Sequence, residues 1–341
     1  MLNKTNNFFD EQTYNRLAII EPIDIPYKSS IINYLNTLPP IEQIKPNFKF
    51  KTEKAPLKSL IESRFARYDS ILNSVKNLEQ KYVLDLKPHK VTIYATNLSK
   101  QYINHVASII RWWEKIKPQT YEITFYLTDI KKILPPDHLP KVITEEFGNS
   151  GFTFVREPSD IHIFRKEESL KVLIHELIHA CKFDFNGSNL IDIPCNIKDD
   201  DISNEGITEY LAIIYYYWYI ASYMSNFADK STINIIFTDL LSHDMGWQDY
   251  QVSKILTYFK LDANHLLEKN NFKQKTSILS YFFLKDYLFT QNSLPIILSR
   301  DINKINGLIR GMKQYLINHK KSPILEQSIS LRMSLYELDY T

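Results

Sequence analysis

The spacing of hydrophobic residues changes along this chain of 341 residues. Up to about residue 55, short apolar runs are separated by prolines, a pattern typical of an extended arm. From Pro56 to about Tyr82, apolar residues recur at intervals of three and four, which predicts an amphipathic helix. We therefore expect an N-terminal extended arm and helix over residues 1–88.

Between residues 89 and 182 the pattern alternates between strand and helix. Short or alternating apolar runs predict four strands, at Val91–Ala95, Tyr121–Leu127, Phe152–Arg156 and Ile161–Arg165. Helical spacing predicts two helices, at Ser99–Lys115 and from Glu167 to about Lys182. This region is expected to form an α/β upper subdomain.

Residues 183–341 carry mostly helical signals and are expected to form an α-helical lower subdomain. The clearest predicted helices are Asn204–Tyr223, Lys254–Leu267 and Thr276–Thr290. The acidic run Asp199–Asp201 is typical of a solvated loop or helix start, and we assign it no metal. The fold class is therefore α+β, with the strands confined to the first half.

The charge balance argues against a nucleic-acid-binding protein. The chain has 41 Lys and Arg against 39 Asp and Glu, so it lacks the basic excess of a nucleic-acid binder. The basic segments 45–58 and 304–321 are typical of solvated faces, and salt-dependent binding would be needed to support the alternative.

The cellular environment of the protein is predicted from its cysteines and apolar stretches. Only two cysteines occur, the helix residue Cys181 and the loop residue Cys195, and the first residues are polar. The apolar stretch 207–223 contains Glu209 and is too short to span a bilayer, so we expect no membrane insertion. These features favour a cytoplasmic, reducing environment.

One motif carries candidate chemistry, within the apolar segment Val172–Cys181. His175 and His179 are four residues apart on a predicted helix, so both imidazoles face one side and can bind one metal ion. Glu176 lies beside them and could act as general base on a zinc-bound water. The neighbouring residues are apolar, and burying these three side chains without a metal would be costly.

A catalytic zinc takes three protein ligands and leaves one position open. The metzincin pattern is excluded, because Lys182 and Phe185 stand where its Gly and His would be. The segment Asn204-Glu205-Gly-Ile-Thr208-Glu209 lies downstream at the start of the next predicted helix. Together, the two motifs resemble those of the gluzincin superfamily of zinc metallopeptidases, which includes thermolysin.

The resemblance implies a role for each matched residue. His175, His179 and Glu205 would bind zinc, and Glu176 would be the general base. Glu209 would orient a zinc-binding imidazole without binding the zinc itself. Independently, Glu205 and Glu209 share a helix face, and metal-bound histidines usually donate a hydrogen bond to a carboxylate. The 25 residues between His179 and Glu205 exceed the thermolysin spacing, so the reverse assignment of the two acids stays open.

The resemblance also implies a fold and a substrate. Gluzincins have a zincin-like catalytic core, in which a twisted mixed β-sheet carries a backing helix and the active-site helix, followed by a helical subdomain. An edge strand of that sheet binds the extended peptide, and either Phe152–Arg156 or Ile161–Arg165 could serve. The expected function is zinc-dependent hydrolysis of a peptide or protein substrate.

Several alternatives stay open at this point. The absence of a Gly-x-Met-Glu-Asn string disfavours an aminopeptidase, whereas endopeptidase and carboxypeptidase activity both fit. Arg310 or Lys313 could bind a terminal carboxylate, but ordinary surface charge is the simpler interpretation of both. The oxyanion donor could be any of Tyr210, Tyr216, Tyr250 and His243, although the tyrosines are also typical of core or surface rings. A catalytically inactive zincin-like protein, using zinc structurally or to bind a partner, is the alternative function.

Overall fold

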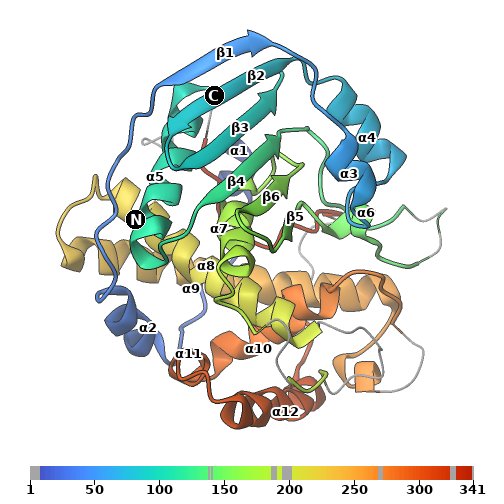
Figure 1. Cartoon of the computed structure of the whole chain (residues 1–341). Coiled ribbons are helices and arrows are strands. Elements are labelled where there is room, and N and C mark those ends of the chain that lie inside the picture. Colours follow the sequence, from blue (N-terminus) through green and yellow to red (C-terminus); the bar gives the residue numbers. More distant parts are fainter. Residues whose placement is uncertain are drawn as a thin grey trace. The chain divides into compact units, whose positions relative to one another are not determined.

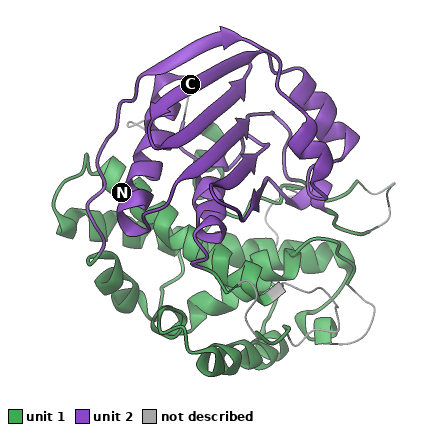
Figure 2. Ribbon diagram, viewed as in Figure 1, with its two compact units in different colours: residues 1–37, 133–144, 184–336 green, residues 38–132, 145–183, 337–341 purple. Residues whose placement is uncertain are grey.

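The computed structural model describes residues 8–136, 139, 141–185, 190–193, 202–267, 272–322 and 328–339. The chain divides into two compact units, coloured separately in Figure 2. Unit 1 comprises residues 1–37, 133–144 and 184–336, and unit 2 comprises residues 38–132, 145–183 and 337–341. Cys195 and the acidic run 199–201 lie outside the described residues.

Unit 2 contains a six-stranded mixed sheet in the order β1-β2-β3-β4-β6-β5 (Figure 1). Its strands are β1 (Phe48–Thr52), β2 (Gln80–Leu86), β3 (His89–Ala95), β4 (Tyr121–Tyr126), β5 (Gly151–Phe154) and β6 (Ser159–Ile163). Strands β3, β4 and β6 are parallel to one another, and the other neighbouring pairs are antiparallel. The predicted combination of helices with a mixed sheet is thus confirmed.

The helices of unit 2 cover both faces of this sheet. They are α3 (Lys58–Glu62), α4 (Asp69–Lys76), α5 (Lys100–Ile116), α6 (Glu145–Gly148) and α7 (Ser169–Ala180). Helices α3 and α4 bury Leu60 and Val75 in one cluster with Tyr94 and Tyr126 of the sheet. Helix α5 packs on the opposite face, where its Tyr102 ring contacts Phe125.

The continuous helix predicted from Pro56 to Tyr82 is wrong. The segment forms α3 and α4 and then enters β2, because Ser63 adopts an extended backbone that ends α3. The apolar residues that suggested one helix are nevertheless buried together, in the cluster that includes Leu60, Ile71 and Val75. Two short helices satisfy the same three- and four-residue spacing by packing on one sheet face.

Unit 1 is mainly helical in its described part. Its helices are α1 (Glu11–Leu17), α2 (Lys28–Leu35), α8 (Ile202–Met224), α9 (Lys230–Phe259), the 3₁₀ helix η1 (Ala263–Leu267), the π-helix η2 (Leu279–Leu284), α10 (Lys285–Thr290), α11 (Ser293–Leu298) and α12 (Ile302–Asn318). Helix α8 contacts α9, α10 and η2, so it is apolar nearly all round. No helix within the described ranges is long and apolar enough to cross a membrane.

Two predictions in this unit need correction. The arm expected before residue 55 contains α1 and α2, and Asp10 caps α1 by accepting a 2.8 Å hydrogen bond from the Thr13 N–H. The helix expected at Lys254–Leu267 is the end of the longer α9 followed by η1. Helix α9 stops at Lys260, whose φ of 58° places it in the left-handed region.

The buried His105 of α5 makes unit 2 sensitive to acid. The residue is 2% exposed, and burial lowers its pKa to about 4 from the ordinary 6.5. The unfolded chain therefore binds a proton below pH 6.5 that the folded chain excludes, so stability falls as the pH drops from 6.5 towards 4.

We expect the His105→Gln variant to lose less stability than wild type between pH 7 and pH 5. The difference in the free energy of unfolding should be about 2 kcal/mol at pH 5, measured by urea denaturation at both pH values. Because only the change with pH is compared, a constant cost of the substitution cancels. Equal pH dependence in the two proteins would contradict a neutral, buried His105.

Candidate metal centre

Helix α7 carries the two histidines and is anchored at its start by buried polar contacts. Lys132 and Glu168 form an ion pair at 2.8 Å with both side chains nearly inaccessible. Glu337 accepts a 2.9 Å hydrogen bond from the Glu168 N–H, and the Tyr102 hydroxyl lies 2.8 Å from the Ser169 Oγ. These contacts all lie within unit 2, and they hold the first turn of α7 against α5.

His175 and His179 lie on one face of α7, as predicted. Their Nε2 atoms are 3.0 Å apart, and their ring planes are inclined at 69°. Two nitrogens bound to one tetrahedral zinc are separated by about 3.3 Å, given Zn–N bonds of about 2.0–2.1 Å. The rings therefore converge on one point, and the pair suits a metal ion as well as it suits a shared proton. His175 is buried, whereas His179 is half-buried.

Glu176 is directed at the edge strand β5. Its Oε2 accepts a 2.7 Å hydrogen bond from the Thr153 hydroxyl, and its side chain is 5% exposed. Gly151 permits this close approach, because a Cβ there would lie 2.9 Å from Glu176 Oε1 and from Val172 Cγ1. The structure therefore gathers three predicted residues, His175, Glu176 and His179, in unit 2.

Glu205 and Glu209 lie on α8, in unit 1, in different surroundings. Glu209 is fully buried, and its carboxylate is 3.6 Å from the Lys285 ammonium, which is equally buried. Glu205 is half-buried and accepts a 3.0 Å hydrogen bond from the Tyr281 hydroxyl. The contact with Tyr281 was not foreseen, because nothing in the sequence distinguishes this residue among 22 tyrosines.

Asn204 explains how the start of α8 is held in place. Its side-chain oxygen accepts a 2.8 Å hydrogen bond from the Phe185 N–H, and its amide donates to Asp184 at 3.1 Å. Gly206 lets η2 pack closely on the helix, since a Cβ there would lie 2.6 Å from the Leu284 side chain. The residues beside Glu205 thus have structural roles within unit 1.

The four candidate oxyanion donors have ordinary surroundings. Tyr210, Tyr216 and Tyr250 are buried rings; Tyr250, for example, stacks on Trp247. His243 has its Nδ1 2.8 Å from the Asp239 carbonyl oxygen, within its own helix. The two candidate carboxylate-binding residues, Arg310 and Lys313, are exposed on α12.

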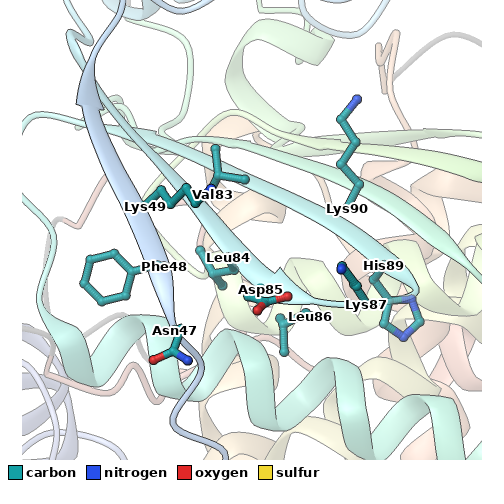
Figure 3. Close-up of a pocket in the computed structure, with 10 residues that line it drawn as sticks. All are labelled: Asn47, Phe48, Lys49, Val83, Leu84, Asp85, Leu86, Lys87, His89 and Lys90. Atoms are coloured by element: carbon teal, nitrogen blue, oxygen red, sulfur yellow. The ribbon is translucent and has the colours of Figure 1, made fainter.

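A separate pocket of about 540 Å³ lies along β1, β2 and the turn into β3 (Figure 3). It lies at the β1 edge of the sheet, and β5 forms the other edge. Lys49, Asp85, Lys87 and Lys90 supply its charged groups, and His89 and Lys90 point to opposite sides of the ribbon. Burial lowers the pKa of His89. The pocket shares no lining residue with the histidine pair.

We expect Gly151→Ala to disturb the packing of α7 on β5. The added methyl group would overlap Val172 and Glu176, and a clash of this kind costs about 1–3 kcal/mol of stability. The matched control is Gly307→Ala in the middle of α12, where a Cβ meets no atom within 4 Å. That change should instead stabilise the protein by about 0.5–1 kcal/mol. Urea denaturation of both variants tests this, and a neutral Gly151→Ala would show that the contact is loose.

No protein-family model, curated protein or solved structure matches this chain. The resemblance to gluzincins therefore consists of the two motifs, which lie in α7 and at the start of α8.

Proposed function

We propose that this protein is a zinc-dependent metallopeptidase in which His175, His179 and Glu205 bind zinc and Glu176 is the general base. The observation that carries the proposal is the arrangement on α7. Two imidazole nitrogens 3.0 Å apart lie beside a buried carboxylate that is hydrogen-bonded to an edge strand. A purely structural zinc site would have no use for a glutamate between its histidines.

The donor set favours zinc over other common ions. Imidazole nitrogens suit zinc, whereas calcium and magnesium prefer sites built from oxygen atoms. When bound, zinc would polarise the substrate carbonyl and make a water molecule acidic enough to lose a proton near neutral pH.

Glu176 would receive that proton and later return it to the leaving amine. For this it must be held in one orientation. The Thr153 hydroxyl contributes to that, because it donates its hydrogen bond to the carboxylate at 2.7 Å. Thr153 is therefore a positioning residue for the base.

Strand β5 supports a peptide as substrate. Of the two strands predicted to bind substrate, β6 lies inside the sheet between β4 and β5, and β5 lies at the edge. Among the described strands, β5 pairs only with β6, so its other side can accept an extended peptide by main-chain hydrogen bonds. Thr153 would then lie on the strand that binds the peptide and also contact the base. The mixed sheet, with α5 on one face and α7 packed on β5 and β6, supports the proposal of a zincin-like core.

The surroundings of the two glutamates favour Glu205 as the third ligand. Glu205 is half-buried and meets a neutral hydroxyl, so its carboxylate is accessible to a cation. Glu209 is fully buried and is neutralised by Lys285, which suits a supporting role.

Metal content tests the ligand assignment. We expect about one zinc per chain to depend on the α7 motif, and Glu205→Ala should lose this ion whereas Glu209→Ala largely keeps it. The measurement is elemental analysis of each purified protein after chelator treatment and readdition of zinc. The result would be reversed if Glu209 were the ligand, and an unchanged zinc content in a His175→Gln variant would refute the site.

Peptide hydrolysis tests the assignment of the base. Glu176→Gln should bind zinc normally but lose activity on a peptide library by a factor of about 100 or more, because its amide cannot accept a proton. The products also separate an endopeptidase from a carboxypeptidase. An active Glu176→Gln variant would contradict the mechanism, and an inactive wild type with stoichiometric zinc would favour the non-catalytic alternative.

Thr153 provides a finer test. Thr153→Val should lower kcat about 10-fold with little change in KM, because the base loses its hydrogen bond while the strand backbone is kept. Thr153→Ser retains the hydroxyl and should restore kcat. Equal losses in both variants would show that the methyl group, and not the hydrogen bond, matters.

A further inference from the structure

Unit 1 contains a second cluster of metal-binding side chains, formed by Asp249, Asp286 and His319. Asp249 comes from α9, Asp286 from α10, and His319 from the residue that ends α12. One candidate ligand atom from each residue lies within 4.8 Å of the other two. Three elements that are distant in the sequence thus bring two carboxylates and one imidazole to a single point.

The polar atoms around the cluster are unevenly satisfied. Asp286 is 4% exposed and accepts a hydrogen bond from the Tyr315 hydroxyl, and the Ser322 hydroxyl donates to the half-buried Asp249. The Nε2 atom of His319 is shielded from solvent and has no hydrogen-bond partner in the described part of the chain. The side chain that lies beside the two carboxylates therefore has a shielded imidazole nitrogen that meets no partner among the described residues.

The two carboxylates of the cluster are held close together away from most of the solvent. The candidate ligand atoms of Asp249 and Asp286 lie within 4.8 Å of each other, and Asp286 is 4% exposed. Two carboxylates in such a setting repel each other, and a divalent cation between them would relieve that repulsion.

We propose that Asp249, Asp286 and His319 form a second metal site, for a divalent transition-metal cation such as Zn²⁺. The imidazole favours zinc and its neighbours in the first transition row over Mg²⁺ and Ca²⁺, whose sites are built from oxygen. The site is independent of the proposed peptidase function, because it shares no residue with the α7 motif. Its bound ion would tie α9, α10 and the end of α12 together, and so would stabilise unit 1.

The test removes the first site so that the second can be counted alone. The full chain carrying His175→Gln and His179→Gln is stripped with chelator, incubated with Zn²⁺, and analysed for bound metal after gel filtration. We expect about one Zn²⁺ per chain in this double variant and none after addition of His319→Gln. Addition of His265→Gln is the matched control and should leave the ion bound, because His265 lies in η1 and contacts Asp262 instead.

Folding is checked by circular dichroism of each zinc-free protein. If His319→Gln does not fold, Asp249→Asn replaces it, since this half-buried side chain tolerates an isosteric change. Zn²⁺ should also raise the Tm of the double variant, and excess Mg²⁺ should not compete. The proposal is overturned if the double variant binds no zinc, or if zinc remains bound after the cluster is changed in a folded protein.

The two proposals fail separately. His319→Gln with an intact α7 motif should still bind about one Zn²⁺ if the peptidase site exists. Loss of zinc from the His175→Gln protein alone reports on the first site, whereas loss that depends on His319 reports on the second.

Discussion

The close packing of α7 on β5 is the constraint on which the candidate metal centre depends. Gly151 has no side chain, so Val172 and Glu176 can approach the edge strand closely. A Cβ atom on residue 151 would lie only 2.9 Å from a side-chain atom of each. This contact directs the Glu176 carboxylate towards Thr153, while the adjoining face of the helix presents His175 and His179. A helix placed even one methyl group further out would separate the Glu176 carboxylate from Thr153.

Buried ion pairs give the motif-bearing helices fixed positions. Lys132 and Glu168 anchor the start of α7, and Lys285 neutralises Glu209 on α8. Each pair is almost wholly removed from water, so removing one partner would leave an uncompensated charge. Such pairs add little net stability, because the cost of taking two charges out of water offsets their attraction. The backbone is therefore held in place at Ser169, which follows Glu168, and at Glu205, one helical turn before Glu209.

The two clusters of candidate ligands differ in how they are built. On α7, a single helix supplies both imidazoles and the Glu176 carboxylate, and four-residue spacing lets the two nitrogens lie 3.0 Å apart. The Asp249, Asp286 and His319 cluster comes from three helices that meet only when unit 1 is folded. The first arrangement suits a site in which the acid–base group must lie next to the metal. The second suits a site that holds helices together.

The sequence by itself determined what depends on local periodicity. It predicted β3, β4, α5 and α7, and it placed His175 and His179 on one face with Glu176 beside them, because i and i+4 residues lie above one another on any α-helix. Only the tertiary structure decided which strand is the edge, since alternation is the same for β5 and β6 and their order depends on long-range pairing. The tertiary structure also decided that residues 56–82 form two helices and a strand, that Thr153 contacts Glu176, and that His319 meets two aspartates. The last two contacts join residues far apart in the chain, and no local pattern encodes them.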